Sequence, residues 1–272
     1  MKKNVAYVIV VLIASLLVIG CSELKEEKIP TQTAVSVHGE GFTNPSSTNF
    51  HGTFIQKSNY DISTCQQCHG LNYAGGTANR SCNTCHNKQD GPENCTTCHG
   101  SVNAAPPNDL IGRSSQTLRS VGAHQKHLLG GSLGSAVACT ECHNVPTTLS
   151  EAGHIDNSQY AEVAFDSTSN KFRSNAVYSA ATISCTNTYC HGNFNGGNLN
   201  ISMTWTDTSS AATACGTCHG DVTKATLKEK AFPTTVHSAA TVTSDCSTCH
   251  RAVVDANMNI INPARHINGG ID

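Results

Sequence analysis

Cysteine and histidine recur together seven times in this 272-residue chain, and this recurrence constrains the fold more than any other feature. Fourteen of the 15 cysteines form pairs, and a histidine directly follows the second cysteine of each pair. Six pairs are separated by two residues and one pair by four. The seven motifs are Cys65/Cys68/His69, Cys82/Cys85/His86, Cys95/Cys98/His99, Cys139/Cys142/His143, Cys185/Cys190/His191, Cys215/Cys218/His219 and Cys246/Cys249/His250.

This motif is the attachment signature of c-type haem. Two thiols add to the vinyl groups on one porphyrin edge, and the adjacent histidine places its imidazole on the iron as the proximal ligand. Zinc sites and disulfides also use paired cysteines, but neither explains a histidine after every pair. The sequence therefore predicts seven c-type haems. At the longer motif a Cys185–Cys190 disulfide remains the alternative, although Gly192 follows His191 as glycine follows other motif histidines, which favours a haem with a bulged attachment loop.

The histidines outside the motifs also number seven. They are His38, His51, His124, His127, His154, His237 and His266. Seven six-coordinate irons need seven distal ligands, so the supply equals the demand. Taken alone, each of these histidines fits a surface or hydrogen-bonding role equally well. Met203 and Met258 are alternative distal ligands, although their neighbouring residues favour packing roles.

The N-terminus has the features of an export signal. Lys2 and Lys3 precede an apolar run over residues 5–19, which is short for a membrane span. Residues 18–21, Val-Ile-Gly-Cys, resemble a bacterial lipobox, which predicts removal of residues 1–20 and lipidation of Cys21. A plain signal peptide or a retained anchor is the alternative. We expect an exported, membrane-anchored lipoprotein of the outer membrane, with the leaflet left open.

Composition limits the core and the partners. The net charge is −2, and the loss of Lys2 and Lys3 from the 17 basic residues against 19 acidic ones makes it −4. Haem propionates add negative charge, which disfavours nucleic acid as a partner. Aromatic residues are only 5% of the chain, so the conventional core is small and the haems must supply apolar surface. The expected fold is a multihaem cytochrome c with few short helices, minimal strand and a largely irregular chain wrapped around covalently bound haems.

Motif spacing predicts the organisation of the mature chain. A flexible tether is expected over residues 21–36, a three-haem module over 37–103 and a four-haem module containing the longer motif over 104–272. His124 and His127 lie three residues apart, so on a helix they share a face and can serve two neighbouring haems. A short strand is expected at 161–165 and a short helix within 223–232.

The second half, roughly residues 95–272, resembles the CxxxxCH/CxxCH-domain multihaem cytochromes c of metal-reducing bacteria. The first module is similar more loosely. The segments that carry the resemblance are residues 121–124, 141–146, 153–156, 161–163, 189–192, 214–220 and 265–269. The resemblance implies an outer-surface role in passing electrons to acceptors outside the cell. It also implies partners such as other cytochromes or an outer-membrane porin–cytochrome complex, and a metal or another extracellular electron acceptor.

The leading functional hypothesis is electron transfer along a chain of haems, each ligated by two histidines. No catalytic residue is predicted, and neither a nucleotide-binding glycine loop nor a convincing triad is visible. Two alternatives stay open. One is a multihaem reductase with one open iron, and the other is a subunit of a cytochrome conduit or filament.

Overall fold

The computed structural model describes residues 37–100, 103–104, 107–156, 158, 160–165, 175–237 and 245–270. The predicted signal segment, Cys21 and the tether lie outside the described residues. The chain divides into two compact units with a boundary between Asn59 and Tyr60. The three-haem and four-haem modules that motif spacing predicts stay a prediction.

The first unit contains one described helix, α2 (His51–Lys57). The aromatic side chains of this unit gather around Phe42, which lies before the helix. The ring centre of Phe42 lies 6.1 Å from that of Phe54. The rings of His38 and His51 lie 4.0 and 5.7 Å from the ring of Phe42. Both histidines of this unit therefore belong to one aromatic cluster.

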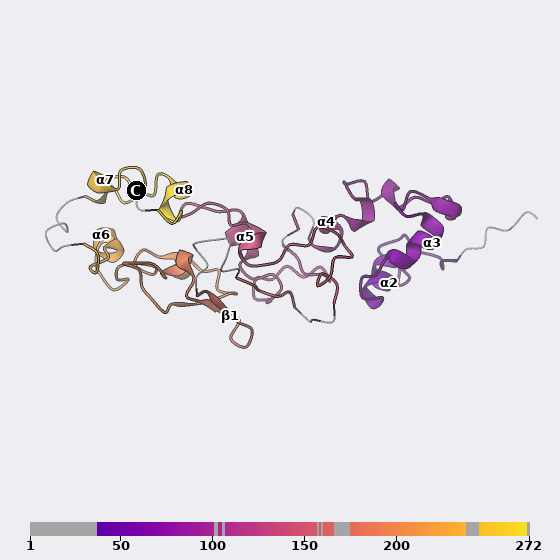
Figure 1. Ribbon diagram of the computed structural model, residues 1–272, viewed down its shortest axis with the longest axis horizontal. Coiled ribbons are helices and arrows are strands. Elements are labelled where there is room, and N and C mark those ends of the chain that lie inside the picture. Colours follow the sequence, from indigo (N-terminus) through magenta and orange to yellow (C-terminus); the bar gives the residue numbers. More distant parts are fainter. Residues whose placement is uncertain are drawn as a thin grey trace, which may run out of the picture. The chain divides into compact units, whose positions relative to one another are not determined.

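In the second unit, most attachment motifs fold as single helical turns (Figure 1). Two intervening residues place the cysteines at positions i and i+3, which lie on one side of a helical turn. The turns at the motifs are η1 (Ser63–Cys65), α3 (Gln66–His69), η3 (Cys82–Thr84), α4 (Cys95–Cys98), η5 (Cys139–Glu141), η6 (Tyr189–His191) and α7 (Cys246–Cys249). Two further turns in this part of the chain are η2 (Gly76–Ala78) and η4 (Gly91–Glu93).

A small antiparallel sheet surrounds the first cysteine of the longer motif. Its strands are β1 (Val177–Ser179), β2 (Ser184–Thr186) and β3 (Ser202–Thr204), in the order β1-β2-β3. Cys185 lies in the central strand, opposite Tyr178 on one side and Met203 on the other.

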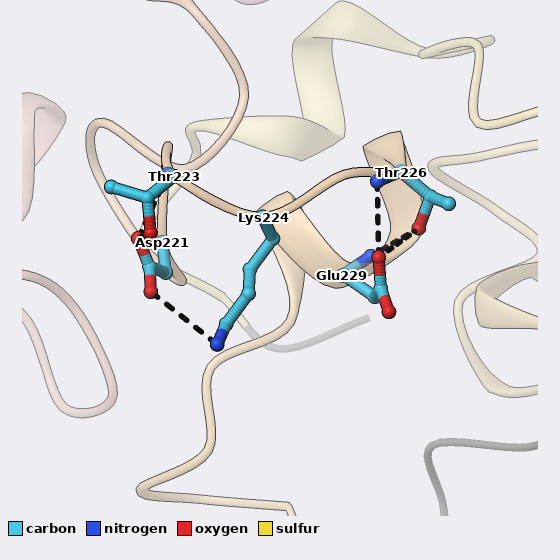
Figure 2. Close-up of polar contacts among 5 residues, drawn as sticks. All are labelled: Asp221, Thr223, Lys224, Thr226 and Glu229. Atoms are coloured by element: carbon cyan, nitrogen blue, oxygen red, sulfur yellow. Dashed lines mark hydrogen bonds and ion pairs between the residues drawn. The ribbon is translucent and has the colours of Figure 1, made fainter.

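Besides η2 and η4, four helical segments of the described chain lie between the motifs or after the last of them. They are α5 (His124–Leu128), η7 (Ser210–Thr213), α6 (Leu227–Ala231) and α8 (Pro263–His266). The helix expected within 223–232 is confirmed but shorter, because Thr226 caps it: the Thr226 side chain accepts from the Glu229 amide, and the Glu229 carboxylate accepts from the Thr226 amide and hydroxyl (Figure 2). The residues just before the cap form a separate turn, in which the Asp221 carboxylate accepts from Thr223 and pairs with Lys224 at 3.8 Å.

The strand expected at 161–165 is wrong, because this segment carries no regular structure. Its backbone instead serves the Cys139/Cys142/His143 motif. The Ala164 amide donates to the Cys142 carbonyl at 2.9 Å, and the Glu162 carbonyl accepts from the His143 ring at 2.7 Å.

The conventional core is sparse. The buried apolar side chains among the described residues are Ile62, Tyr73, Val121, Ala123 and Val254. The described part of the chain contains no helix that is both long and apolar enough to span a membrane. The architecture is that of a multihaem cytochrome, with short helices, a three-stranded sheet and mostly irregular chain.

Candidate haem sites

The helical turn of a short motif brings its histidine back over its first cysteine. In four motifs the histidine amide donates to the carbonyl of that cysteine at 2.8–3.0 Å. The four histidines are His86, His99, His143 and His250. Because this bond closes one turn, the two thiols and the imidazole are held together by local backbone geometry alone.

The motif cysteines differ in exposure, although the sequence treats all of them alike. Eight are half-buried, and six are exposed. The exposed ones are Cys68, Cys85, Cys95, Cys139, Cys215 and Cys249.

The first two motifs show the physical reason for this difference. Cys68 lies in α3, where its carbonyl accepts from the Thr77 hydroxyl at 3.3 Å, and the Cys85 amide donates to the Cys82 carbonyl at 3.2 Å. These bonds fix the backbone of the turns but place no other segment over the thiols, and Cys68 and Cys85 stay exposed. Haem attachment at both cysteines stays a prediction, which rests on their spacing from Cys65 and Cys82.

The longer motif brings its residues together by a different route. Cys185 lies on strand β2, and Cys190 and His191 lie in the turn η6. Between them Asn187 takes a left-handed conformation with φ of 56°, which turns the chain from the strand into η6. The two additional residues therefore accommodate a strand-to-turn transition. Cys185 and Cys190 are not joined in a disulfide, in contrast to the alternative considered for this motif.

Five motif histidines face a histidine from the predicted distal set. In each case the two ring centres lie 6.0–6.3 Å apart. The pairs are His99–His154 (6.0 Å), His143–His124 (6.3 Å), His191–His127 (6.1 Å), His219–His266 (6.3 Å) and His250–His237 (6.1 Å).

This spacing fits a metal ion between the rings. Two imidazoles on opposite sides of one first-row metal, with bonds of about 2 Å, have ring centres about 6 Å apart. A direct stack of two rings would bring them closer, as the His38–Phe42 stack at 4.0 Å does. The five histidine pairs therefore fit the two axial positions of a haem iron.

Backbone carbonyls hold many of the predicted ligand histidines in a tautomer that leaves Nε2 available for a metal. Nine histidines place Nδ1 within 2.7–3.2 Å of a main-chain carbonyl. They are His51, His69, His124, His127, His143, His154, His219, His237 and His266. A carbonyl oxygen only accepts, so Nδ1 carries the proton and Nε2 keeps its lone pair for a metal. Such bonds also fix the orientation of a ligating ring.

His191 is different from these nine. Its Nδ1 is buried and lacks a hydrogen-bond partner among the described residues. Burial, reinforced by the neighbouring His127, lowers the pKa of His191 to about 4. Burial likewise raises the pKa of the thiols of Cys185 and Cys190, each to about 11. The longer motif is therefore strongly desolvated, and its imidazole is neutral at neutral pH, as an iron ligand must be.

Helix α5 supplies two histidines to two different pairs. His124 faces His143, and His127 faces His191, as their spacing on one helical face predicts. The buried residues Val121 and Ala123 precede the helix, and their carbonyls accept from the rings of His124 and His127.

Trp205, to which sequence reasoning assigned no role, contacts both histidines of α5. Its ring centre lies 4.7 Å from that of His124 and 5.7 Å from that of His127. The indole Nε1 donates to the carbonyl of Arg119 at 2.8 Å, across 86 residues of sequence. The only available signal was that Trp205 is the single tryptophan of the chain.

The remaining predicted ligands lie in both units. His38 and His51 belong to the aromatic cluster of the first unit, and His69 and His86 belong to the second. His86 lines a cavity of about 480 Å³ together with Tyr73 and Glu93. The Tyr73 hydroxyl donates to the Glu93 carboxylate at 2.9 Å, which ties the chain before the second motif to the chain before the third.

The alternative ligands have other surroundings. Met203 lies on β3 opposite Cys185, and Met258 lies in a turn with φ of 65°. Within the described ranges, no group of three or more His, Cys, Asp or Glu side chains is positioned to hold a metal ion among themselves, as a zinc site would require.

Comparison with known proteins gives one match. Residues 184–219 match the family model of the Geobacter CxxxxCH...CXXCH motif. This segment contains the longer motif and the Cys215/Cys218/His219 motif that follows it. No curated protein and no solved structure matches the chain significantly. Residues 184–219 thus carry the motif of a multihaem c-type cytochrome, and electron transfer by bound c-type haem is the role that this motif indicates.

Proposed function

We propose that this chain is a lipid-anchored heptahaem c-type cytochrome that passes electrons along haems ligated by two histidines each. The observation that carries the proposal is the set of five histidine pairs, each joining a motif histidine to a histidine of the predicted distal set. Chance contacts among 14 histidines would also join motif histidines to one another. The five pairs instead follow the division between proximal and distal ligands.

For the first two motifs, the proposal of two histidines per iron rests on number alone, because two motif histidines and two other histidines remain outside the five pairs. His69 and His86 stay the predicted proximal ligands, and His38 and His51 stay distal candidates that are assigned to no particular haem. Nδ1 of His51 donates to the Phe42 carbonyl at 2.9 Å, and Nδ1 of His69 donates to the Arg80 carbonyl at 2.7 Å. Both rings therefore present Nε2 for a metal, as the paired histidines do.

A haem iron supplies one-electron exchange between the ferric and ferrous states without making or breaking a substrate bond. The residues of the chain hold and tune each site. The cysteines would provide the covalent links, the histidines would ligate the iron through Nε2, and the carbonyls at Nδ1 would fix the ring planes. Two histidines per iron leave no coordination position for a substrate, which favours a carrier over a reductase.

Location and partners extend the proposal beyond the described residues. Lipidation of Cys21 would hold the cytochrome at the outer membrane through the tether at 22–36. An acidic, membrane-held electron carrier suits exchange with other cytochromes or with an outer-membrane porin–cytochrome complex, and finally with a metal or another extracellular acceptor. The support for this part is the lipobox-like segment and the matched motif.

The intact mass of the native lipoprotein tests the count and the anchor together. We expect a mass that corresponds to residues 21–272 with seven haems and a lipid on Cys21, and low-spin iron throughout in the electron paramagnetic resonance (EPR) spectrum. Fewer than seven haems, an unprocessed N-terminus or a native high-spin signal would each contradict the corresponding part of the proposal.

A distal-ligand variant tests the assignment of histidines. His266→Ala should open one iron, so that the reduced protein binds carbon monoxide at one haem and the native protein at none. Met258→Ala is the matched control, because Met258 is the nearby alternative ligand in the sequence and should leave all irons closed. Carbon monoxide binding by Met258→Ala but not by His266→Ala would overturn the assignment.

A further inference from the structure

The five histidine pairs fall into two groups by the angle between their ring planes. His99–His154 and His143–His124 are close to parallel, at 28° and 29°. The other three, His191–His127, His219–His266 and His250–His237, are close to perpendicular, at 70°, 74° and 66°. In motif order, the near-parallel pairs precede the near-perpendicular ones. The change falls at helix α5, which supplies one histidine to each group.

Trp205 lies where the ring planes change. Its ring is edge-on to His124, with an interplanar angle of 86°, and stacked on His127, with an angle of 25°. One indole therefore contacts both imidazoles but holds them in different planes. Each ring also donates from Nδ1 to a different carbonyl, Val121 for His124 and Ala123 for His127, so the indole packs against two rings that are anchored separately.

The indole is itself held firmly. Nε1 donates to the Arg119 carbonyl, and the Trp205 carbonyl accepts from the Ala123 amide at 3.1 Å. The Trp205 amide donates to Ile183, next to strand β2. Gly122 packs directly against the indole, and a methyl group at this position would overlap Nε1. Gly122 also has a φ of 42°, which a residue with a side chain rarely adopts.

Ring planes influence the reduction potential of an iron between two imidazoles. Parallel imidazoles donate π density into the same iron d orbital, which stabilises the ferric state and lowers the potential. Perpendicular imidazoles spread the donation over two d orbitals, which stabilises the ferric state less and gives a more anisotropic EPR signal. Axial ligand orientation is thus one of the means by which a protein tunes a haem.

The hydrogen bonds of the rings should shift the reduction potentials of the two sites in the same sense as the ring planes do. His143 and His124 both donate from Nδ1 to a carbonyl, which makes each imidazole a stronger electron donor. His191 is buried and its Nδ1 has no partner among the described residues. A less basic ligand in a less polar setting favours the ferrous state, because reduction removes a net positive charge from the iron and its ring.

We propose that Trp205 is a positioning residue that sets the ring planes of His124 and His127, and thereby gives the His191–His127 site a higher reduction potential than the His143–His124 site. This inference rests on the proposed function. A single electron leaving the reduced His143–His124 site oxidises it by one unit and reduces the His191–His127 site by one unit, with no bond or proton transferred. Helix α5 then directs electrons toward the three near-perpendicular sites of the C-terminal motifs.

EPR and spectroelectrochemical titration of the full-length holoprotein test the proposal. His124→Ala and His127→Ala identify the two signals, because each removes one low-spin signal and makes that site high-spin. The native protein should then show a less anisotropic signal and a lower potential at the His124 site than at the His127 site. In Trp205→Leu we expect both signals to shift and the difference in potential to shrink, while the other sites keep their values.

Phe232 provides a matched control, because its ring contacts a single histidine among the described residues. The ring of Phe232 lies 5.1 Å from that of His237, so Phe232→Leu should shift the His250–His237 signal alone. Trp205→Phe and Gly122→Ala disturb the indole contact by two further routes, and keep the test decisive if Trp205→Leu does not fold. Both should shift the same two signals as Trp205→Leu.

The results separate this inference from the proposed function. Missing haems at these two motifs, or native high-spin iron there, would refute the ligation on which both depend. Two intact low-spin signals that all three variants leave unchanged would refute only the role of Trp205. A native His127 site with the lower potential would refute the direction of electron flow.

Discussion

At the scale of single residues, hydrogen bonds to backbone carbonyls orient the histidine rings. Histidines of the predicted ligand set donate to carbonyls outside the attachment motifs, such as Ala231 for His219 and Leu133 for His266, both at 2.7 Å. A shift of such a carbonyl therefore changes the ring plane and basicity of a ligand without touching the motif. The buried carboxylate of Asp109 is likewise held by hydrogen bonds to the backbone, in this case to main-chain amides.

Asp109→Asn should destabilise the loop before α5. The Asp109 carboxylate accepts from the amides of Ile111 and Arg113 at 3.1 and 2.8 Å, and pairs with the Arg113 guanidinium at 2.6 Å. We expect the free energy of unfolding to fall by about 2 kcal/mol, which chemical denaturation followed by circular dichroism measures. Asp207→Asn is the control, because Asp207 accepts from Ser209 in an exposed turn and should matter little.

The carboxyl group of Asp109 should also make the stability of the protein depend on pH. Burial raises the pKa of Asp109, but the bonds from Arg113 and Ile111 outweigh it and leave the pKa below its ordinary value. A carboxyl with a lowered folded-state pKa stabilises the protein above its unfolded pKa of about 3.9, and loses this contribution as the pH falls below that value. The difference in stability between the native protein and Asp109→Asn should therefore shrink below about pH 4.

At the scale of elements, short helices act as supports for ligands. Helix α6 is only five residues long, so its cap contributes much of its stability. Its last residue, Ala231, provides the carbonyl for His219, and the Lys230 carbonyl accepts from the Asp221 amide at 2.8 Å. Gly220, with φ of 81°, passes directly against Lys230. Figure 2 shows the cap at the start of α6, and the other end of this helix supplies the carbonyl that accepts from the His219 ring.

Thr226→Ala should disturb the His219–His266 site from a distance. Loss of the capping box costs about 1 kcal/mol of helix stability, and fraying of α6 weakens the bond from His219 to Ala231. A less basic His219 gives a higher reduction potential at this site, which a redox titration followed by optical absorption measures. Thr223→Ala is the control, because Thr223 lies in the neighbouring turn and caps no helix. Equal potentials in the two variants would show that α6 does not orient His219.

At the scale of the whole molecule, few side chains are buried in the described part of the chain, and we expect them to be too few to drive folding on their own. The buried apolar residues of the described chain are spread over motif turns, the segment before α5 and the region after the last motif. Many large apolar side chains are exposed instead, among them Leu71 at 85% and Leu129 at 72%. Covalently bound porphyrins are the apolar surface that such side chains can cover.

The chain without haem should therefore be poorly folded. Protein retained in the cytoplasm, where no haem is attached, is expected to show weak circular dichroism and no cooperative melting transition. The holoprotein is the reference and should melt cooperatively. Cooperative melting of the haem-free chain with the spectrum of the holoprotein would show that the side chains suffice for folding.

Sequence reasoning succeeded where structure depends on neighbouring residues, as in the helix that contains His124 and His127 and in most of α6. It failed at 161–165, where an apolar alternation typical of a strand is outweighed by backbone hydrogen bonds to the Cys139/Cys142/His143 motif. It gave Trp205 no role, since the contacts of that side chain are with a helix far away in the sequence.

The exposure of the thiols was also beyond sequence reasoning. Cys68 and Cys85 are exposed, whereas Cys98 and Cys218 are half-buried, although all four are the second cysteine of a motif with two intervening residues. A motif sets the distance between its own residues, but the segments that pack over them come from elsewhere in the chain. Strands β1 and β3 flank Cys185 in this way.

The attachment chemistry can be read from the chain because one helical turn brings two thiols and an imidazole together, whatever surrounds it. The pairing of histidines cannot be read in this way. His99 faces His154, although His124 is nearer to it in the sequence. His191 faces His127, and a whole attachment motif lies between these two in the sequence. The partner histidines and their ring planes come from separate segments of the chain, so packing in three dimensions decides them. Some carbonyls at Nδ1 are local, such as Val121 for His124, whereas others are distant, such as Leu133 for His266. The potential of an iron depends on these contacts, and thus on the tertiary fold.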